Sequence, residues 1–270
     1  MNLTVVLVAG LLLWAVLAAI MSVAWVVQQR TRNNGFIDAV WTFGLGAVGV
    51  VSALVPLEGS GTPSGRQLLV AVLIGAWSLR LGGHILRRSN ARSDDPRYAA
   101  LMRQWGEDAR RQMFILMQKQ AIVTVPLALA LFLAARNPAP LFRFLDYAAL
   151  AVVLIGLVGE SIADRQLATW AKSKGKNELI CDRGLWRWSR HPNYFFEWMF
   201  WVAIPLLAIA GSYPWGWLAL AAPLCIYWLL VHVSGIPPLE EHMVQKYGAA
   251  YRSYQARTSA FFPWPPRGAP

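Results

Sequence analysis

Long apolar segments constrain what this chain can fold into more than any other feature of its sequence. A transmembrane α-helix needs about 20 mostly apolar residues to cross a bilayer, and here 56% of the 270 residues are hydrophobic while only 14% are charged. We therefore predict an all-α integral membrane protein with seven transmembrane helices. The predicted spans cover residues 3–27, 36–56, 67–86, 113–135, 145–163, 195–209 and 215–234.

The positive charges follow the pattern that membrane topology imposes. Of the 25 Lys and Arg residues, 20 lie in four polar segments, at 29–35, 87–112, 165–193 and 237–270. Because Lys and Arg concentrate on the cytoplasmic side of membrane proteins, we expect these segments in the cytoplasm, the N-terminus outside and the C-terminus inside. Topology thus accounts for most of the net charge of +11, and we expect no nucleic acid partner.

The chain shows no internal repeat or low-complexity linker, so we predict one domain over residues 1–270. Within it, residues 1–135 are expected to hold the substrate and residues 145–262 the cofactor. The two cysteines, Cys181 and Cys225, cannot form a disulfide framework and lack metal-ligand spacing. We therefore expect no disulfide bond and no bound metal.

A glycine pattern at residues 44–49 (GLGAVG) matches the dinucleotide fingerprint GxGxxG. That fingerprint works between a strand and a helix N-terminus, where backbone N–H groups are free to meet a pyrophosphate. Here the pattern lies inside a predicted transmembrane helix, whose N–H groups are already hydrogen-bonded. We interpret these glycines as a surface for close helix packing.

The segment 184–194 (GLWRWSRHPNY) holds the densest group of functional side chains. Arg187 and Arg190 carry planar guanidinium groups suited to phosphates, and Asn193 can both donate to and accept from a carboxamide. Pro192 favours the start of a helix, whose N-terminus attracts anions, and Glu197 lies one turn inside it. An interfacial anchor is the alternative reading, but so many polar groups exceed what anchoring needs.

A second basic group begins within the third predicted span. Arg80 and His84 lie one turn apart on one face, which leads to Arg87 and Arg88 at the end of the span. The following segment, 93–98 (SDDPRY), includes Asp95, Arg97 and Tyr98. This group suits a ribose and a phosphate, although headgroup contact for the arginines and a simple helix start at the proline remain alternatives.

Acidic residues near span ends are further candidates. Asp38 opens the second span, where a carboxyl group is costly in free energy unless it is paired or neutral. A protonated Asp38 could donate a hydrogen bond to a ligand. Alternatively, the residue could only cap its helix. Glu160 and Asp164 share one helix face, where they could accept bonds from sugar hydroxyls or pair with Arg165. Near the C-terminus, Glu240 precedes Tyr247, Tyr251 and Tyr254, which would share one face of a continuous helix, either interfacial or a lid.

Several segments together resemble the steroid 5α-reductase superfamily, most closely its bacterial DUF1295-like branch. They are GLWRWSRHPNYFFEW at 184–198, EEHMVQKYGAAYRSY at 240–254, FFPW at 261–264, NGFIDAVW at 34–41 and DDPRYAALMRQWG at 94–106. Members of the superfamily are membrane enzymes that use NADPH to saturate an activated C=C bond. The resemblance implies a bacterial inner-membrane protein whose active site opens to the cytoplasm.

The resemblance also implies positions for the cofactor and the catalytic groups. NADPH contacts are implied at Asp164, Arg190, Asn193, Tyr194, Glu197, Glu240 and Tyr247, with Leu167, Trp186 and His191 beside them. The Glu and Tyr that superfamily members use for catalysis have no clear counterpart here, and Asp38, Trp77 or Tyr98 occupy comparable regions. We predict Asp38 and Tyr98 as catalytic residues.

We therefore hypothesise NADPH-dependent reduction of a lipophilic enone, such as a 3-oxo-Δ4 steroid, an isoprenoid or a fatty acyl derivative. Six further residues would complete the cofactor site: Arg80, Arg88, Asp95, Arg97, Glu160 and Arg187. Asn193 and Glu197 would orient the nicotinamide. The alternative is a membrane methyltransferase of the isoprenylcysteine carboxyl methyltransferase type, which shares an RHPxY…EE pattern and binds S-adenosylmethionine. A lipid-binding or transporter-like protein would instead place polar residues through the whole bundle.

Overall fold

The computed structural model describes residues 1–31, 33–56, 61–90, 96–173, 175 and 178–267. In this part of the chain the regular structure is helical, with two isolated β-bridges and no strand. Within the described residues, six helical segments are long and apolar enough to cross a membrane, so the prediction of an integral membrane protein is confirmed. They are Leu3–Thr31, Ile37–Leu54, Gly65–Arg88, Leu101–Ala135, Phe144–Ser173 and Pro214–Tyr247.

These six segments coincide with six of the predicted spans. The remaining one, 195–209, falls in α7 (Pro192–Ala208), which has only 17 residues. The count of seven spans and the orientation of the termini therefore stay predictions. The chain divides into two compact units, one formed by 1–146 and 204–222 and the other by 147–203 and 223–270.

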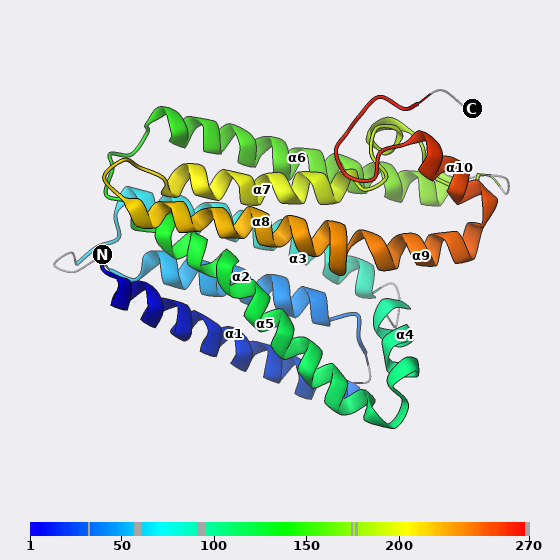
Figure 1. Ribbon diagram of the computed structural model, residues 1–270, viewed down its shortest axis with the longest axis horizontal. Helices are drawn as coiled ribbons and strands as arrows, with labels where there is room; N and C mark the ends of the chain where they lie inside the picture. Colours follow the sequence, from blue (N-terminus) through cyan, green and yellow to red (C-terminus); the bar gives the residue numbers. More distant parts are fainter. Residues whose placement is uncertain (32, 57–60, 91–95, 174, 176–177, 268–270) are drawn as a thin grey trace. The chain divides into compact units, whose positions relative to one another are not determined.

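The first unit contains α1 (Leu3–Thr31), α2 (Ile37–Leu54), α3 (Gly65–Asn90), α4 (Pro96–Trp105) and α5 (Ala109–Ala135) (Figure 1). Its apolar helices pack closely because small residues line their contacts. A Cβ atom added to Gly46 would lie 2.1 Å from Ser78 Oγ of α3, and one added to Gly49 would lie 2.8 Å from Leu131. The interpretation of the GxGxxG pattern as a packing surface is confirmed.

A buried ion pair closes one end of the first unit. Arg66 at the start of α3 is 4% exposed and Asp146 is fully buried, and two hydrogen bonds of 2.8 and 3.0 Å join them. Arg143 also bonds to Asp146, at 3.1 Å. The Nη1 and Nη2 groups of Arg66 also donate to the backbone carbonyls of Leu207, Ala139 and Pro140. The pair therefore fixes the 137–143 turn against α3.

The second unit contains most of α6 (Phe144–Ser173) and of α7, and also α8 (Ala221–Trp228), α9 (Ile236–Tyr247) and α10 (Ala249–Arg257). Between α8 and α9 the chain forms a π-helical segment, Leu229–Val233. The residues after α10, which we call the C-terminal strap (258–267), pair with the segment before α7. Ser259 O accepts a bond from Arg190 N at 2.8 Å, and Trp188 O accepts one from Trp264 N at 2.9 Å.

The predicted continuous face of Tyr247, Tyr251 and Tyr254 is wrong, because the helix breaks at Gly248. That glycine has a φ of +52°, a left-handed value that glycine adopts without a steric cost, and it separates α9 from α10. Tyr251 and Tyr254 are each 2% exposed and belong to the interior of the second unit, whereas Tyr247 is partly exposed at the end of α9.

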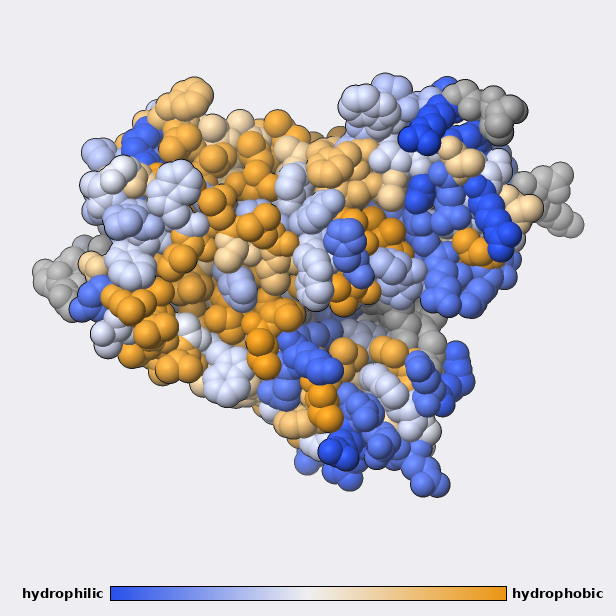
Figure 2. Space-filling model, viewed as in Figure 1, coloured by the Kyte–Doolittle hydropathy of each residue, from blue (hydrophilic) through white to orange (hydrophobic). Residues whose placement is uncertain are grey.

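Polar and apolar side chains separate along the helices, as a bilayer requires. Figure 2 shows hydrophobic side chains over the bodies of the helices in each unit. Hydrophilic side chains gather toward α4 in the first unit and toward α9 and α10 in the second (Figure 2). Each unit therefore carries its polar candidate residues at one end.

Candidate functional site

A hydrogen-bonded chain of three side chains from three helices forms the polar centre of the first unit. Tyr98 of α4 is 6% exposed, and its hydroxyl group donates to Asp38 Oδ1 of α2 at 2.7 Å. The same hydroxyl oxygen accepts a bond from Gln120 Nε2 of α5 at 3.1 Å. The two residues predicted to be catalytic thus contact each other directly, although 60 positions separate them in the sequence.

Aromatic residues and a second hydrogen bond hold this chain in place. Trp41, one turn after Asp38 in α2, donates from Nε1 to Thr124 Oγ1 at 2.7 Å and packs edge-on against the fully buried Trp77 at 6.3 Å. Thr124 in turn donates to the backbone carbonyl of Gln120 at 2.6 Å. The contacts of Trp41 therefore fix α2 against α5 where Asp38 and Gln120 meet Tyr98.

This arrangement can supply a proton or a hydrogen bond in a largely apolar setting. Asp38 lies in the first turn of α2, whose N-cap residue is Phe36, so capping does not explain its position. A tyrosine hydroxyl group can act as a general acid, and here its O–H would turn from Asp38 to reach a ligand. Sequence reasoning missed Gln120, although it is one of the few polar residues of the predicted span 113–135 and could have been found on that ground.

In the second unit, Glu240 of α9 is the hub of a separate polar network. Its carboxylate accepts two bonds from Arg190, at 2.6 and 3.0 Å, one from Gln255 Nε2 at 2.7 Å, and lies 3.0 Å from His191 Nε2. Arg190 also donates from Nη1 to the carbonyls of Gln255 and Thr258. The network joins the segment before α7 to α9, α10 and the C-terminal strap.

This network determines what Arg190 and His191 can still do. Arg190 uses four of the five N–H groups of a guanidinium in these bonds, and the Tyr251 hydroxyl group also lies within hydrogen-bond reach of it, so Arg190 has little left for a ligand. His191 is 3% exposed. Burial lowers its pKa, and the nearby Glu240 opposes that effect only in part. The imidazole is therefore held in its neutral form, and its N–H can donate to Glu240.

Trp186 and Glu197, both predicted to contact NADPH, are engaged within the second unit. Trp186 is 8% exposed, and its indole N–H donates to Ala163 O at 2.9 Å. Glu197 is 6% exposed and accepts a bond from Trp201 Nε1 at 2.9 Å. These side chains are therefore oriented by their own bonds before any ligand arrives.

Three other predicted residues of the same segment are more accessible. Tyr194 is partly exposed and stacks on the His191 ring, with centroids 5.5 Å apart. Arg187 is exposed, and Asn193 is partly exposed in the first turn of α7. Among the residues that the structure describes, neither an ion pair of Arg187 nor a hydrogen bond of the Asn193 amide is present.

The remaining predicted contacts of the second unit lie on α6 and α9. Glu160 and Asp164 are buried on α6, at 4% and 9% exposure, which agrees with their predicted common face. Leu167 follows them on α6, and both it and Tyr247 are partly exposed. The interior position of the two acids is compatible with either predicted role, as acceptors for a ligand or as partners of basic side chains.

The predicted basic group of the first unit is described only in part. Arg80 is partly exposed and Arg88 is exposed, both on α3. Asp95 lies outside the described residues, and for Arg97 the structure describes only the backbone, in the first turn of α4. Their contacts with a cofactor stay predictions.

Two further observations bear on what the protein binds. Among the described residues, no group of three or more His, Cys, Asp or Glu side chains could hold a metal ion.

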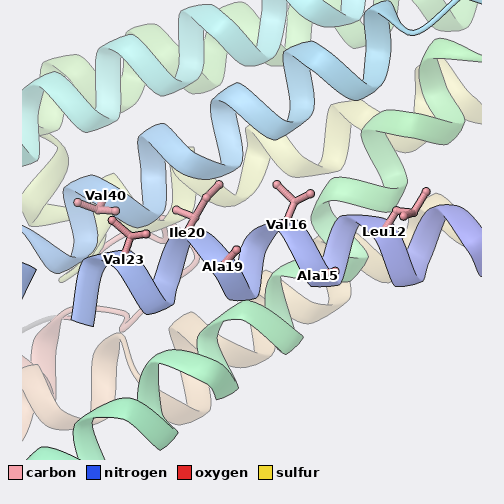
Figure 3. A pocket seen from close by; sticks show the side chains of 7 residues that line it. All are labelled: Leu12, Ala15, Val16, Ala19, Ile20, Val23 and Val40. Atoms are coloured by element: carbon pink, nitrogen blue, oxygen red, sulfur yellow. The ribbon is translucent and has the colours of Figure 1, made fainter. Parts of the chain in front are cut away.

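A groove of about 520 Å³ runs along α1 and is lined only by apolar residues, as Figure 3 shows: Leu12, Ala15, Val16, Ala19, Ile20, Val23 and Val40. A groove without polar groups suits hydrocarbon and provides no chemistry.

The fold and these two polar networks define a class of protein, a helical integral membrane protein with buried acids and an acid–tyrosine pair. A family model described as a protein of unknown function (DUF1295) matches residues 24–258, and the chain belongs to this family. The chain is also 28% identical, over 285 aligned positions, to the uncharacterized protein C594.04c of Schizosaccharomyces pombe. The alignment covers 95% of this chain and 79% of the yeast protein. No solved structure matches the chain significantly.

Proposed function

We propose that this protein is an NADPH-dependent membrane reductase that saturates the activated C=C bond of a lipophilic enone. The observation that carries the proposal is the 2.7 Å hydrogen bond between Tyr98 and Asp38, because it positions a buried phenol that can turn to donate to an enone carbonyl. The resemblance to the steroid 5α-reductase superfamily supports NADPH as the cofactor. The orientation inferred from the charges, with the C-terminus in the cytoplasm, gives the cofactor access from that side.

The side chains of the second unit fit such a cofactor. Arg187 is exposed and suits a phosphate group, since guanidinium and phosphate form paired hydrogen bonds. The Asn193 amide has donors and an acceptor that no described residue uses, and a carboxamide needs both. Arg190 is engaged by Glu240, by two carbonyl groups and by Tyr251, so its main role is to hold the segment, and its contribution to a phosphate is small.

When bound, NADPH supplies the hydride that adds to the β-carbon of the enone. Tyr98 donates a hydrogen bond and then a proton to the carbonyl oxygen, where negative charge develops as the hydride adds. Before this step the Tyr98 O–H turns from Asp38 Oδ1, which it bonds in the free protein, to the carbonyl oxygen. The Gln120 amide donates to the Tyr98 oxygen and so stabilises the phenolate that forms, which regains a proton from solvent. A second proton transfer, from oxygen to the α-carbon through solvent, completes the addition of one hydride and one proton.

The test is consumption of NADPH by the purified protein with a panel of lipophilic enones. Tyr98→Phe should lower kcat by about 100- to 10,000-fold, the usual contribution of a general acid, and should leave NADPH binding unchanged. Tyr147→Phe is the matched control, since Tyr147 is 58% exposed and should keep full activity. Wild-type turnover by Tyr98→Phe would contradict the assigned role of Tyr98.

A further inference from the structure

The end of α6 and the segment after it form a hollow that the proposed reaction does not use, with a mostly apolar lining and a few polar side chains. Its volume is about 360 Å³. The lining side chains are Ile162, Arg165, Gln166, Thr169, Trp170 and Ser173 from α6, followed by Cys181, Arg183 and Gly184. Of these nine residues two are cationic and none is acidic, so the hollow favours an anion.

Three side chains of this hollow, Arg165, Arg183 and Gln166, have N–H groups that can reach a ligand. Arg165 is exposed and has no ion pair among the residues that the structure describes. Arg183 is 67% exposed and contacts Glu178 at 2.6 Å, a surface pair of low strength that an anion can replace. The Gln166 side chain accepts a bond from Leu185 N through its oxygen, which leaves its amide N–H groups for a ligand.

The wall of the hollow is held closely against α6. Gly184 has a φ of +56°, and an added Cβ atom would lie 2.5 Å from Gln166 Nε2. A glycine at this position therefore allows the segment to pass directly over Gln166. The hydroxyl group of Ser173 donates to the carbonyl of Thr169 at 3.0 Å, so it is fixed at the same end of the helix.

An apolar stripe leads along α6 into the hollow. Ile155, Val158 and Ile162 are spaced three and four residues apart, so they share one helix face, and they are 50%, 47% and 41% exposed. This face continues directly to Arg165 and Thr169, and Ile162 itself lines the hollow. Because α6 is long and apolar enough to span a membrane, its exposed apolar side chains face lipid tails.

We propose that this hollow binds the phosphate group of an anionic phospholipid whose acyl chain lies along Ile155, Val158 and Ile162. Arg165 and Arg183 contact the phosphate, and basic pockets at the polar ends of membrane helices are known to favour such headgroups. A free phosphate or a nucleotide would use the same cations but would leave the apolar stripe unused. The site is independent of the proposed reaction, and its ligand is a bound lipid.

The test is a lipid titration of the full chain in detergent, read by native mass spectrometry. Wild type should bind phosphatidylglycerol at least about tenfold more tightly than phosphatidylcholine, because both lipids carry a phosphate but choline brings a positive charge next to Arg165 and Arg183. Arg165→Gln should remove most of this preference. Arg252→Gln is the matched control, because Arg252 is exposed on α10 and lies outside the hollow.

Glu178→Gln should change lipid binding in the opposite direction from Arg165→Gln, because it frees Arg183 and removes a negative charge. This variant should bind phosphatidylglycerol more tightly than wild type, which damage to the fold cannot produce. Equal binding of phosphatidylglycerol by all variants would overturn the proposal. So would displacement of the lipid by inorganic phosphate or NADPH at similar concentrations, since the hollow would then be a site for a soluble phosphate.

Discussion

At the scale of single residues, each network depends on one side chain with several bonds. Tyr98 links Asp38 to Gln120 in the first unit, and Glu240 links Arg190, His191 and Gln255 in the second. Such shared partners make networks cooperative, so the loss of one member leaves others unsatisfied. The sequence indicated Asp38, Tyr98, Arg190 and Glu240 individually, since acids and arginines near spans are conspicuous.

Sequence reasoning could not show which of these residues bind one another. An arginine held by a carboxylate and a free arginine look the same in a sequence. The sequence therefore predicts that Arg190 binds phosphate, whereas in the structure most of its donors bond to Glu240 and two carbonyl groups. The pairing of Asp38 with Tyr98 depends on the packing of α4, which no local pattern encodes.

His191 provides a prediction about pH. In the unfolded chain its imidazole titrates near pH 6.5, whereas burial lowers its pKa in the folded protein. Below about pH 6.5 the unfolded state therefore binds a proton that the folded state does not, and stability falls as the pH decreases. The variant His191→Gln keeps an N–H donor toward Glu240. Its melting temperature should fall less between pH 7 and pH 5 than that of wild type. An unchanged pH profile in this variant would exclude His191 as the cause.

At the scale of elements, the apolar runs predicted the spans well because a bilayer forces backbone hydrogen bonds into helices. Breaks inside the helical runs were harder to predict. The last span contains a π-helical segment, Leu229–Val233, and Gly248 ends α9 through a positive φ. Both depend on tertiary packing that competes with the helical periodicity.

The contact between α2 and α3 yields a prediction about packing. Gly46→Ala places a methyl group 2.1 Å from Ser78 Oγ and should destabilise the protein by about 1–3 kcal/mol, as overpacking does. Gly75→Ala is the control, since its nearest contact would be Val50 at 3.8 Å, and it should be neutral or slightly stabilising. Thermal unfolding in detergent measures both, and Ser78→Gly should restore the stability of Gly46→Ala. Equal melting temperatures for the two alanine variants would contradict this packing.

At the scale of the whole molecule, the arrangement of the basic segments predicts the topology. With seven spans, the N-terminus is outside and the C-terminus is cytoplasmic, because the basic segments 87–112 and 165–193 remain inside. A reporter enzyme that is active only outside the cytoplasm should be active when fused to the N-terminus and inactive at the C-terminus. Activity at both ends would mean that the number of spans is even and that α7 does not cross the membrane.

The most direct test of the central claim is thermal unfolding of the purified full chain with NADPH and, separately, with S-adenosylmethionine. A reductase of the proposed kind should be stabilised by NADPH, by about 2.7 kcal/mol at a concentration 100 times its Kd, and should not respond to S-adenosylmethionine. Asn193→Ala should remove the NADPH effect while its unfolding without ligand stays that of wild type. Stabilisation by S-adenosylmethionine and not by NADPH would contradict the account and identify a methyltransferase instead.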